Sequence, residues 1–124
     1  MILNIKSKVD GKNNKIFFST GGRNFNPEIP AIIFIHGAGM DHTVWSLQSR
    51  YFAHRGFSVL AIDLPGNGRS EGNCLESIEE MAKWVNDFII NSNLKKVSLV
   101  GHSMGALVTL ECASIYPKII RSIC

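Results

Sequence analysis

Apolar runs that alternate with helix-like segments constrain the fold of this chain more than any other feature. The run Ala31–Ile35 is apolar at every position, which is typical of a strand buried on both faces. Residues 57–62 and 96–100 read as further strands of this kind. Strands that alternate with helices predict an α/β fold with a mostly parallel sheet and helices on both faces.

The segments between these runs carry helix signals. Residues 44–55 are expected to form a helix that Asp41 starts. Ser77 begins another helix, with Glu80 three residues later in the pattern of a capping box. The helix expected over 106–115 is apolar on most sides, which predicts that it packs deep against the sheet.

The two ends of the chain are expected to add strands. Residues 2–9 and 15–20 predict an N-terminal β-hairpin, because the Asp10-Gly11 pair between them is a turn signal. Residues 119–124 have the composition of the start of one more strand. We find no internal repeat and no linker, so the whole chain is expected to belong to one domain.

Composition and charge exclude several classes of function. The net charge is +3, and the lysines and arginines are scattered, so no nucleic-acid-binding stripe is expected. No apolar stretch is long enough to span a bilayer. The cysteines are odd in number and form no CxxC pair, which favours reduced thiols and a cytoplasmic location: Cys74, Cys112 and Cys124.

The segment Gly101-His102-Ser103-Met104-Gly105 lies between a predicted strand and a predicted helix. A serine at such a sharp turn has its hydroxyl exposed above the edge of the sheet. The chain passes so tightly there that the flanking positions must be small, and Gly101 and Gly105 meet that requirement. Ser103 is therefore the candidate nucleophile.

A serine nucleophile needs a base and donors for the oxyanion that forms on the substrate. The backbone N–H of Met104, at a helix N-terminus, is one candidate donor. The loop His36-Gly37-Ala38-Gly39 follows another strand and is rich in small residues, so its N–H groups are accessible. Ala38 is the expected second donor, with Gly39 as the next choice.

Three segments, 36–39, 63–70 and 101–105, resemble the N-terminal half of the α/β-hydrolase superfamily. Their order and spacing are similar to esterase-like, monoacylglycerol-lipase-like and proline-iminopeptidase-like members. The resemblance implies Ser103 as nucleophile and the N–H groups of Ala38 and Met104 as the oxyanion hole. It implies a small-molecule ester or amide substrate and no cofactor. Asn67 stands where many members carry histidine, at a loop position outside the catalytic triad.

The acid and the base that follow the serine in this fold are absent from the sequence. The residues after Ser103 contain neither His nor Asp, and Glu111 lies within the predicted helix. The resemblance therefore predicts a partial α/β-hydrolase domain over 1–124. The later strands, any lid and the rest of the triad would be missing, and this fragment would have little activity.

The other polar residues near the strand ends are expected to support the site. His36 would shape the oxyanion loop, His102 would pack beside the serine, and Asp63 would hold the turn at 66–68 through backbone N–H groups. His42 is expected to be an ordinary loop residue. No pair of histidines has metal-ligand spacing with a carboxylate, so no metal site is expected.

Two other hypotheses compete with a serine hydrolase. The chain could be a non-catalytic fragment or pseudoenzyme that binds without turnover. A nucleotide-binding module would also place a glycine turn between a strand and a helix. That motif needs glycine where Ser103 stands, and its acidic residue would come later than Glu111, so the sequence disfavours it.

Overall fold

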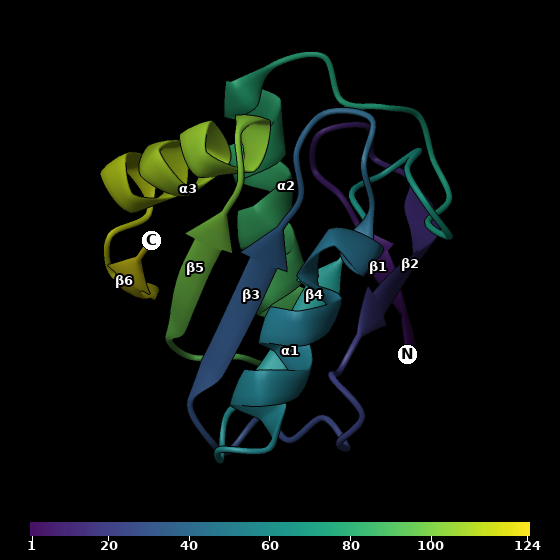
Figure 1. The fold of residues 1–124 in the computed structure, drawn as a ribbon. Helices are drawn as coiled ribbons and strands as arrows, with labels where there is room; N and C mark the ends of the chain where they lie inside the picture. Colours follow the sequence, from purple (N-terminus) through teal and green to yellow (C-terminus); the bar gives the residue numbers. More distant parts are fainter.

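The computed structural model describes residues 1–124. Its strands form one six-stranded sheet with the order β1-β2-β4-β3-β5-β6 (Figure 1). The strands are β1 Ile2–Lys6, β2 Asn13–Ser19, β3 Ala31–Ile35, β4 Ser58–Ile62, β5 Val97–Gly101 and β6 Ile120–Ile123. The helices are a short 3-10 helix η1 His42–Trp45, α1 Ser46–Ala53, α2 Ile78–Asn91 and α3 Met104–Ile115. Strands β4, β3, β5 and β6 are parallel, and the antiparallel hairpin β1–β2 extends the sheet beyond β4, which confirms the predicted fold class.

Strand β3 lies inside the sheet and is buried on both faces. Ile33 and Ile35 belong to the larger hydrophobic cluster, whereas Ile32 and Phe34 belong to the smaller one. Successive side chains of a strand point to opposite faces, so a strand covered on both sides has to be apolar at every position. This burial on both faces explains why the segment Ala31–Ile35 is apolar at every position.

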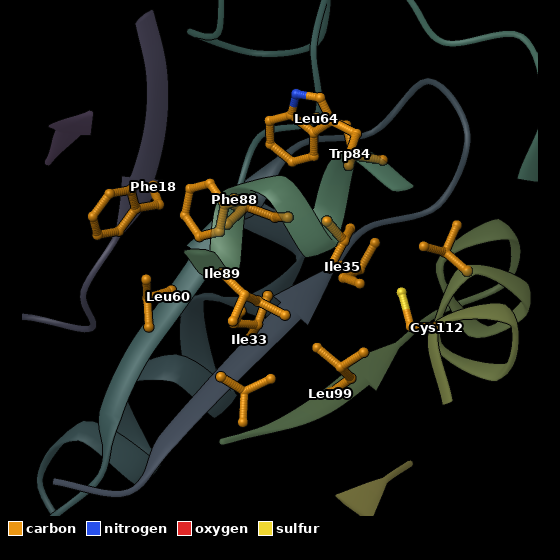
Figure 2. Close-up of a cluster of buried hydrophobic side chains, with 14 of the residues drawn as sticks. Phe18, Ile33, Ile35, Leu60, Leu64, Trp84, Phe88, Ile89, Leu99 and Cys112 are labelled. Atoms are coloured by element: carbon orange, nitrogen blue, oxygen red, sulfur yellow. The ribbon is translucent and has the colours of Figure 1, made fainter. Parts of the chain in front are cut away.

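The larger cluster lies between the sheet and helices α2 and α3. Figure 2 shows Ile89 of α2 beside Ile33 of β3, and Phe88 of α2 beside Phe18 of β2. Helix α2 begins as predicted, because the hydroxyl of Ser77 accepts a hydrogen bond from the N–H of Glu80 (3.1 Å). The Glu80 carboxylate accepts from the N–H of Glu76, one residue before the cap, and not from the N–H of Ser77 as in a regular capping box.

The smaller cluster lies on the opposite face, where η1 and α1 cover the sheet (Figure 1). The Asp41 carboxylate accepts a hydrogen bond from the N–H of Thr43 (2.9 Å), which confirms that Asp41 starts this helical segment. The segment differs from the predicted 44–55 helix in its first turn, which is 3-10. Trp45 and Ala53 are buried against the sheet.

The first hairpin strand is shorter than predicted, because it ends at Lys6, whereas the second begins earlier than predicted, at Asn13. Beyond Lys6, the Ser7 hydroxyl accepts from the N–H of Val9, and the Asp10 carboxylate accepts from the N–H of Lys12. Side chains that take backbone donors in this way compete with strand pairing. The connection is therefore a longer loop than the Asp10-Gly11 pair indicates.

The prediction that the helix after the serine packs deep against the sheet is wrong. Helix α3 buries one side, through Gly105, Val108, Thr109 and Cys112. Leu107 and Leu110 on its outer side are 54% and 56% exposed, because no element of this chain covers them. No helix in the structure has the length and apolarity that crossing a membrane requires.

Candidate active site

Ser103 occupies the sharp turn between β5 and α3 and is exposed. Its backbone angles are φ 56° and ψ −116°, and only one other non-glycine residue, Asn93, has a positive φ. A side chain in this region carries about 1–3 kcal/mol of strain, which persists only where the surroundings impose the geometry. Strain of this kind is typical of functional sites.

The two glycines of the motif make the turn sterically possible. A β-carbon at Gly105 would collide with the carbonyl oxygen of Ile35, and one at Gly101 would collide with the carbonyl oxygen of Gly105. The N–H of His102 donates to the Ile35 carbonyl (3.1 Å). The turn that carries Ser103 is thus packed against the end of β3, where the 36–39 loop begins.

His36 begins the 36–39 loop and is fully buried. Its Nε2 accepts a hydrogen bond from the N–H of Leu64 (3.1 Å), and its Nδ1 lies 2.7 Å from the carbonyl oxygen of Gly37. These partners assign the proton to Nδ1, which donates to Gly37. His36 therefore links the loop after β3 to the loop after β4.

The loop turns immediately after Gly37. The N–H of Met40 donates to the Gly37 carbonyl (3.2 Å), which closes a turn across Ala38 and Gly39. A β-carbon at Gly37 would lie 3.4 Å from the carbonyl oxygen of His102, so this loop and the serine turn are neighbours. Ala38 and Gly39 are both exposed.

Asp63 directly follows β4 and is fully buried. Its carboxylate accepts hydrogen bonds from the N–H of His42 (2.7 Å), from Nδ1 of the same residue (2.9 Å) and from the N–H of Arg69 (2.9 Å). The bond to Arg69 lies just beyond the 66–68 turn that Asp63 was expected to hold. The expectation that His42 is an ordinary loop residue is wrong, because it is the main partner of this carboxylate.

The sequence contains one signal that could have found the Asp63–His42 pair. Both residues follow the carboxyl ends of β3 and β4, which are adjacent and parallel. Polar groups that follow such strands meet at one edge of the sheet. The partners are 21 residues apart along the chain, so only the strand order brings them together.

A cleft of about 170 Å³ opens beside the 36–39 loop. It brings together Ala38 and Gly39 of that loop with Met104 at the start of α3. Ser103 is not one of its wall residues and precedes Met104. The remaining wall residues come from the loop after β4 and from the start of the α2 region: Leu64, Pro65, Asn67, Cys74, Leu75 and Met81.

Asp41, His42 and Asp63 are the residues closest to a metal-ligand set, with ligand atoms within 4.8 Å of one another. Their atoms already have protein partners. Asp63 accepts the bonds described above, and Asp41 accepts from both the N–H and the hydroxyl of Thr43. These bonds lower the pKa of the Asp41 carboxyl below its ordinary value of 3.8. We derive no metal chemistry from this cluster.

The remaining candidates lie at the margin of the site. The His102 side chain is exposed, and its ring faces the edge of Trp45 at 6.5 Å between centroids. Cys112 lies on the buried side of α3, where burial raises the pKa of its thiol to about 12. Neither residue lines the cleft.

The fold and the site define a parallel α/β protein whose exposed serine is held at a strand–helix elbow. The family model described as alpha/beta hydrolase fold matches residues 30–124. The chain belongs to the α/β-hydrolase family, as the three sequence motifs predict.

Curated relatives of this chain are esterases and other hydrolases. It is 32% identical over 91 residues to the (E)-2-((N-methylformamido)methylene)succinate hydrolase of Acinetobacter baylyi, covering 73% of this chain and 34% of the relative. It is 33% identical over 108 residues to a pimeloyl-acyl-carrier protein methyl ester esterase of Methylococcus capsulatus, covering 87% and 39%. The chain spans less than half the length of either relative.

Solved structures give the same fold. A thermophilic esterase from Thermogutta terrifontis superposes with a TM-score of 0.81 at 22% identity, covering 99% of this chain and 44% of that one. A marine microorganism esterase superposes with a TM-score of 0.76 at 27% identity, covering 87% and 40%.

Proposed function

We propose that the complete protein is a serine hydrolase that cleaves carboxylic esters through an acyl-enzyme on Ser103. The observation that carries this proposal is the backbone of Ser103, which is exposed and has a positive φ between a parallel strand and a helix. Membership of the α/β-hydrolase family and the esterases among the relatives support the ester as substrate.

In the proposed reaction the Ser103 hydroxyl oxygen attacks the carbonyl carbon of the ester. Negative charge then develops on the carbonyl oxygen. The first N–H groups of a helix have no intrahelical acceptor, so Met104 at the start of α3 has a free donor for this charge. Ala38 would supply the second donor, or else Gly39, since both line the same cleft as Met104.

The proposed reaction also needs a base for the serine proton, and the described side chains supply none. Ser103 has no side-chain capping bond, and the four histidines have partners or positions elsewhere. In this fold the acid and the histidine follow the serine along the chain. We assign both to the complete protein and expect the 124-residue chain to have little activity by itself.

The same proposal includes a reducing, cytoplasmic setting. Cys74, Cys112 and Cys124 are all free, and two of them are exposed. Exposed free thiols persist where glutathione and thioredoxin keep cysteines reduced.

A fluorophosphonate probe tests the assignment of the nucleophile. The complete protein should be labelled covalently, and the Ser103→Ala variant should not. Ser98→Ala is the matched control, because this serine lies on β5, the strand that leads to Ser103, and its hydroxyl is 2.7 Å from that of Ser122. Labelling that survives Ser103→Ala contradicts the assignment, and a complete protein that resists the probe favours a non-catalytic role.

A further inference from the structure

The cleft beside the oxyanion loop has a composition that restricts what it can bind. Its floor consists of Leu64, Pro65 and Met81, which are all buried. Leu75 and the side chain of Met104 add apolar surface, and none of the wall residues is Asp, Glu, Lys, Arg or His. An ionised group placed in such a cleft would lose its hydration without gaining a partner.

The polar side chains of the wall bind their own loop. The amide nitrogen of Asn67 donates to the carbonyl of Pro65 (3.0 Å). The Cys74 thiol lies 3.7 Å from the carbonyl oxygen of Gly66, within range of a weak sulfur hydrogen bond. The cleft therefore offers a ligand mainly apolar contact, and its walls include Ala38, Gly39 and Met104, the residues proposed above as oxyanion donors.

The size of the cleft sets a second restriction. A cavity of about 150 Å³ lined by apolar side chains holds one benzene molecule. The cleft of about 170 Å³ therefore accommodates a group of about six carbon atoms. Two of its wall residues are methionines, whose flexible side chains adapt to differently shaped apolar groups.

Cys74 lies at the mouth of this cleft and is exposed. Its backbone and thiol pack against Gly66, since a β-carbon on that glycine would come within 2.8 Å of the sulfur. The Cys74 side chain is thus held against the loop after β4 and forms a fixed part of the rim.

We propose that this cleft binds an uncharged, apolar acyl group of at most about six carbons, and that Cys74 limits its length. The inference rests on the function proposed above. The acyl group stays attached to Ser103 through both half-reactions, next to the oxyanion donors, whereas the alcohol leaves after the first. The cleft that contains those donors is therefore assigned to the acyl group.

An acyl series on the complete protein tests the substrate class. With p-nitrophenyl esters, kcat/KM should rise from acetate through butyrate to hexanoate and fall at decanoate. The hemisuccinate ester, which carries a carboxylate on a chain of butyrate length, should be at least about 100-fold poorer than butyrate. A flat profile, or a hemisuccinate that matches butyrate, overturns the proposal.

Thiol modification tests the role of Cys74 without a substitution that could disturb folding. In a Cys124→Ser background, benzyl methanethiosulfonate transfers its benzylthio group to the Cys74 thiolate and releases methanesulfinate. The added group should lower kcat/KM for hexanoate by about 10-fold or more and change that for acetate less than about threefold. Dithiothreitol should restore the original profile by reducing the mixed disulfide.

The control adds Cys74→Ser to that background, which removes the reactive thiol. The reagent should then leave kcat/KM unchanged for both esters, even if the variant itself is less active. An equal loss for acetate and hexanoate, no loss for either, or a loss that follows the alcohol instead of the acyl group overturns the inference. Failure of the proposed function has a different signature, because fluorophosphonate labelling would then survive Ser103→Ala or be absent from the complete protein.

Discussion

The carboxylate of Asp63 accepts hydrogen bonds from both the backbone N–H (2.7 Å) and the ring Nδ1 (2.9 Å) of His42. His42 begins η1, just after the 36–39 loop, and Asp63 begins the loop after β4. A third bond, from the N–H of Arg69, reaches the far side of that second loop. One buried carboxylate thus joins the two loops that form the walls of the cleft.

Asp63→Asn should destabilise the protein, because the amide replaces an acceptor of several N–H groups inside the fold. A loss of about 1–3 kcal/mol in the free energy of unfolding is expected, measured by urea denaturation. Asp10→Asn is the control, since asparagine can still accept from the N–H of Lys12 in that exposed loop, and its effect should stay within about 0.5 kcal/mol. Equal effects of the two variants would show that the Asp63 bonds contribute nothing specific.

Gly105→Ala tests the close packing of the serine turn on β3. The added β-carbon would collide with the carbonyl oxygen of Ile35, so the turn or the strand end must move. The expected loss is about 3 kcal/mol of unfolding free energy, together with loss of probe labelling at Ser103. Ala106→Gly, at the next position of α3, should cost about 1 kcal/mol through helix propensity alone and keep the labelling. A Gly105→Ala variant as stable as the wild type contradicts this geometry.

Asp41 caps η1, and this cap should make the free energy of unfolding depend on pH in a direction that the structure fixes. The hydroxyl and N–H of Thr43 lower the pKa of this carboxyl in the folded state. Its stabilising effect is therefore complete above its ordinary value of 3.8 and is lost as the pH falls through the lowered folded-state pKa. Asp41→Ala should cost about 1 kcal/mol at pH 7, and the cost should shrink when unfolding is measured below that pKa. A cost that grows with acidity would contradict the assignment.

The cysteines should differ sharply in reactivity. Burial raises the pKa of Cys112 to about 12, and its side chain is 1% exposed. Cys74 and Cys124 are exposed. A thiol reagent such as dithionitrobenzoate should therefore label two cysteines rapidly in the folded protein and Cys112 only after unfolding. Rapid labelling of Cys112 in native conditions would show that α3 separates from the sheet.

Much of the fold follows from local patterns. The uniformly apolar run of β3 predicts a strand covered on both faces, and Ser77 with Glu80 predicts the start of α2. These signals depend only on residues that are close together along the chain, so they can be recognised in a single sequence. The length of the hairpin loop was missed because Ser7 and Asp10 take backbone donors that strand pairing would otherwise use.

Other features depend on which elements become neighbours in space. The sequence shows that α3 is apolar on most sides, but the sheet and α2 cover only one of them. The bond between His42 and Asp63 likewise requires β3 and β4 to lie side by side. The serine turn was predictable, since its glycines, strand and helix are contiguous, whereas its packing on Ile35 requires the sheet.

The formation of an acyl-enzyme tests the central claim most directly. The complete protein is mixed with p-nitrophenyl butyrate, quenched in acid within the burst phase, digested and examined by mass spectrometry. The account predicts a butyryl group on the peptide that contains Ser103, and no such adduct in Ser103→Ala. A burst of nitrophenol with the acyl group on another residue, or turnover that persists in the alanine variant, would contradict it.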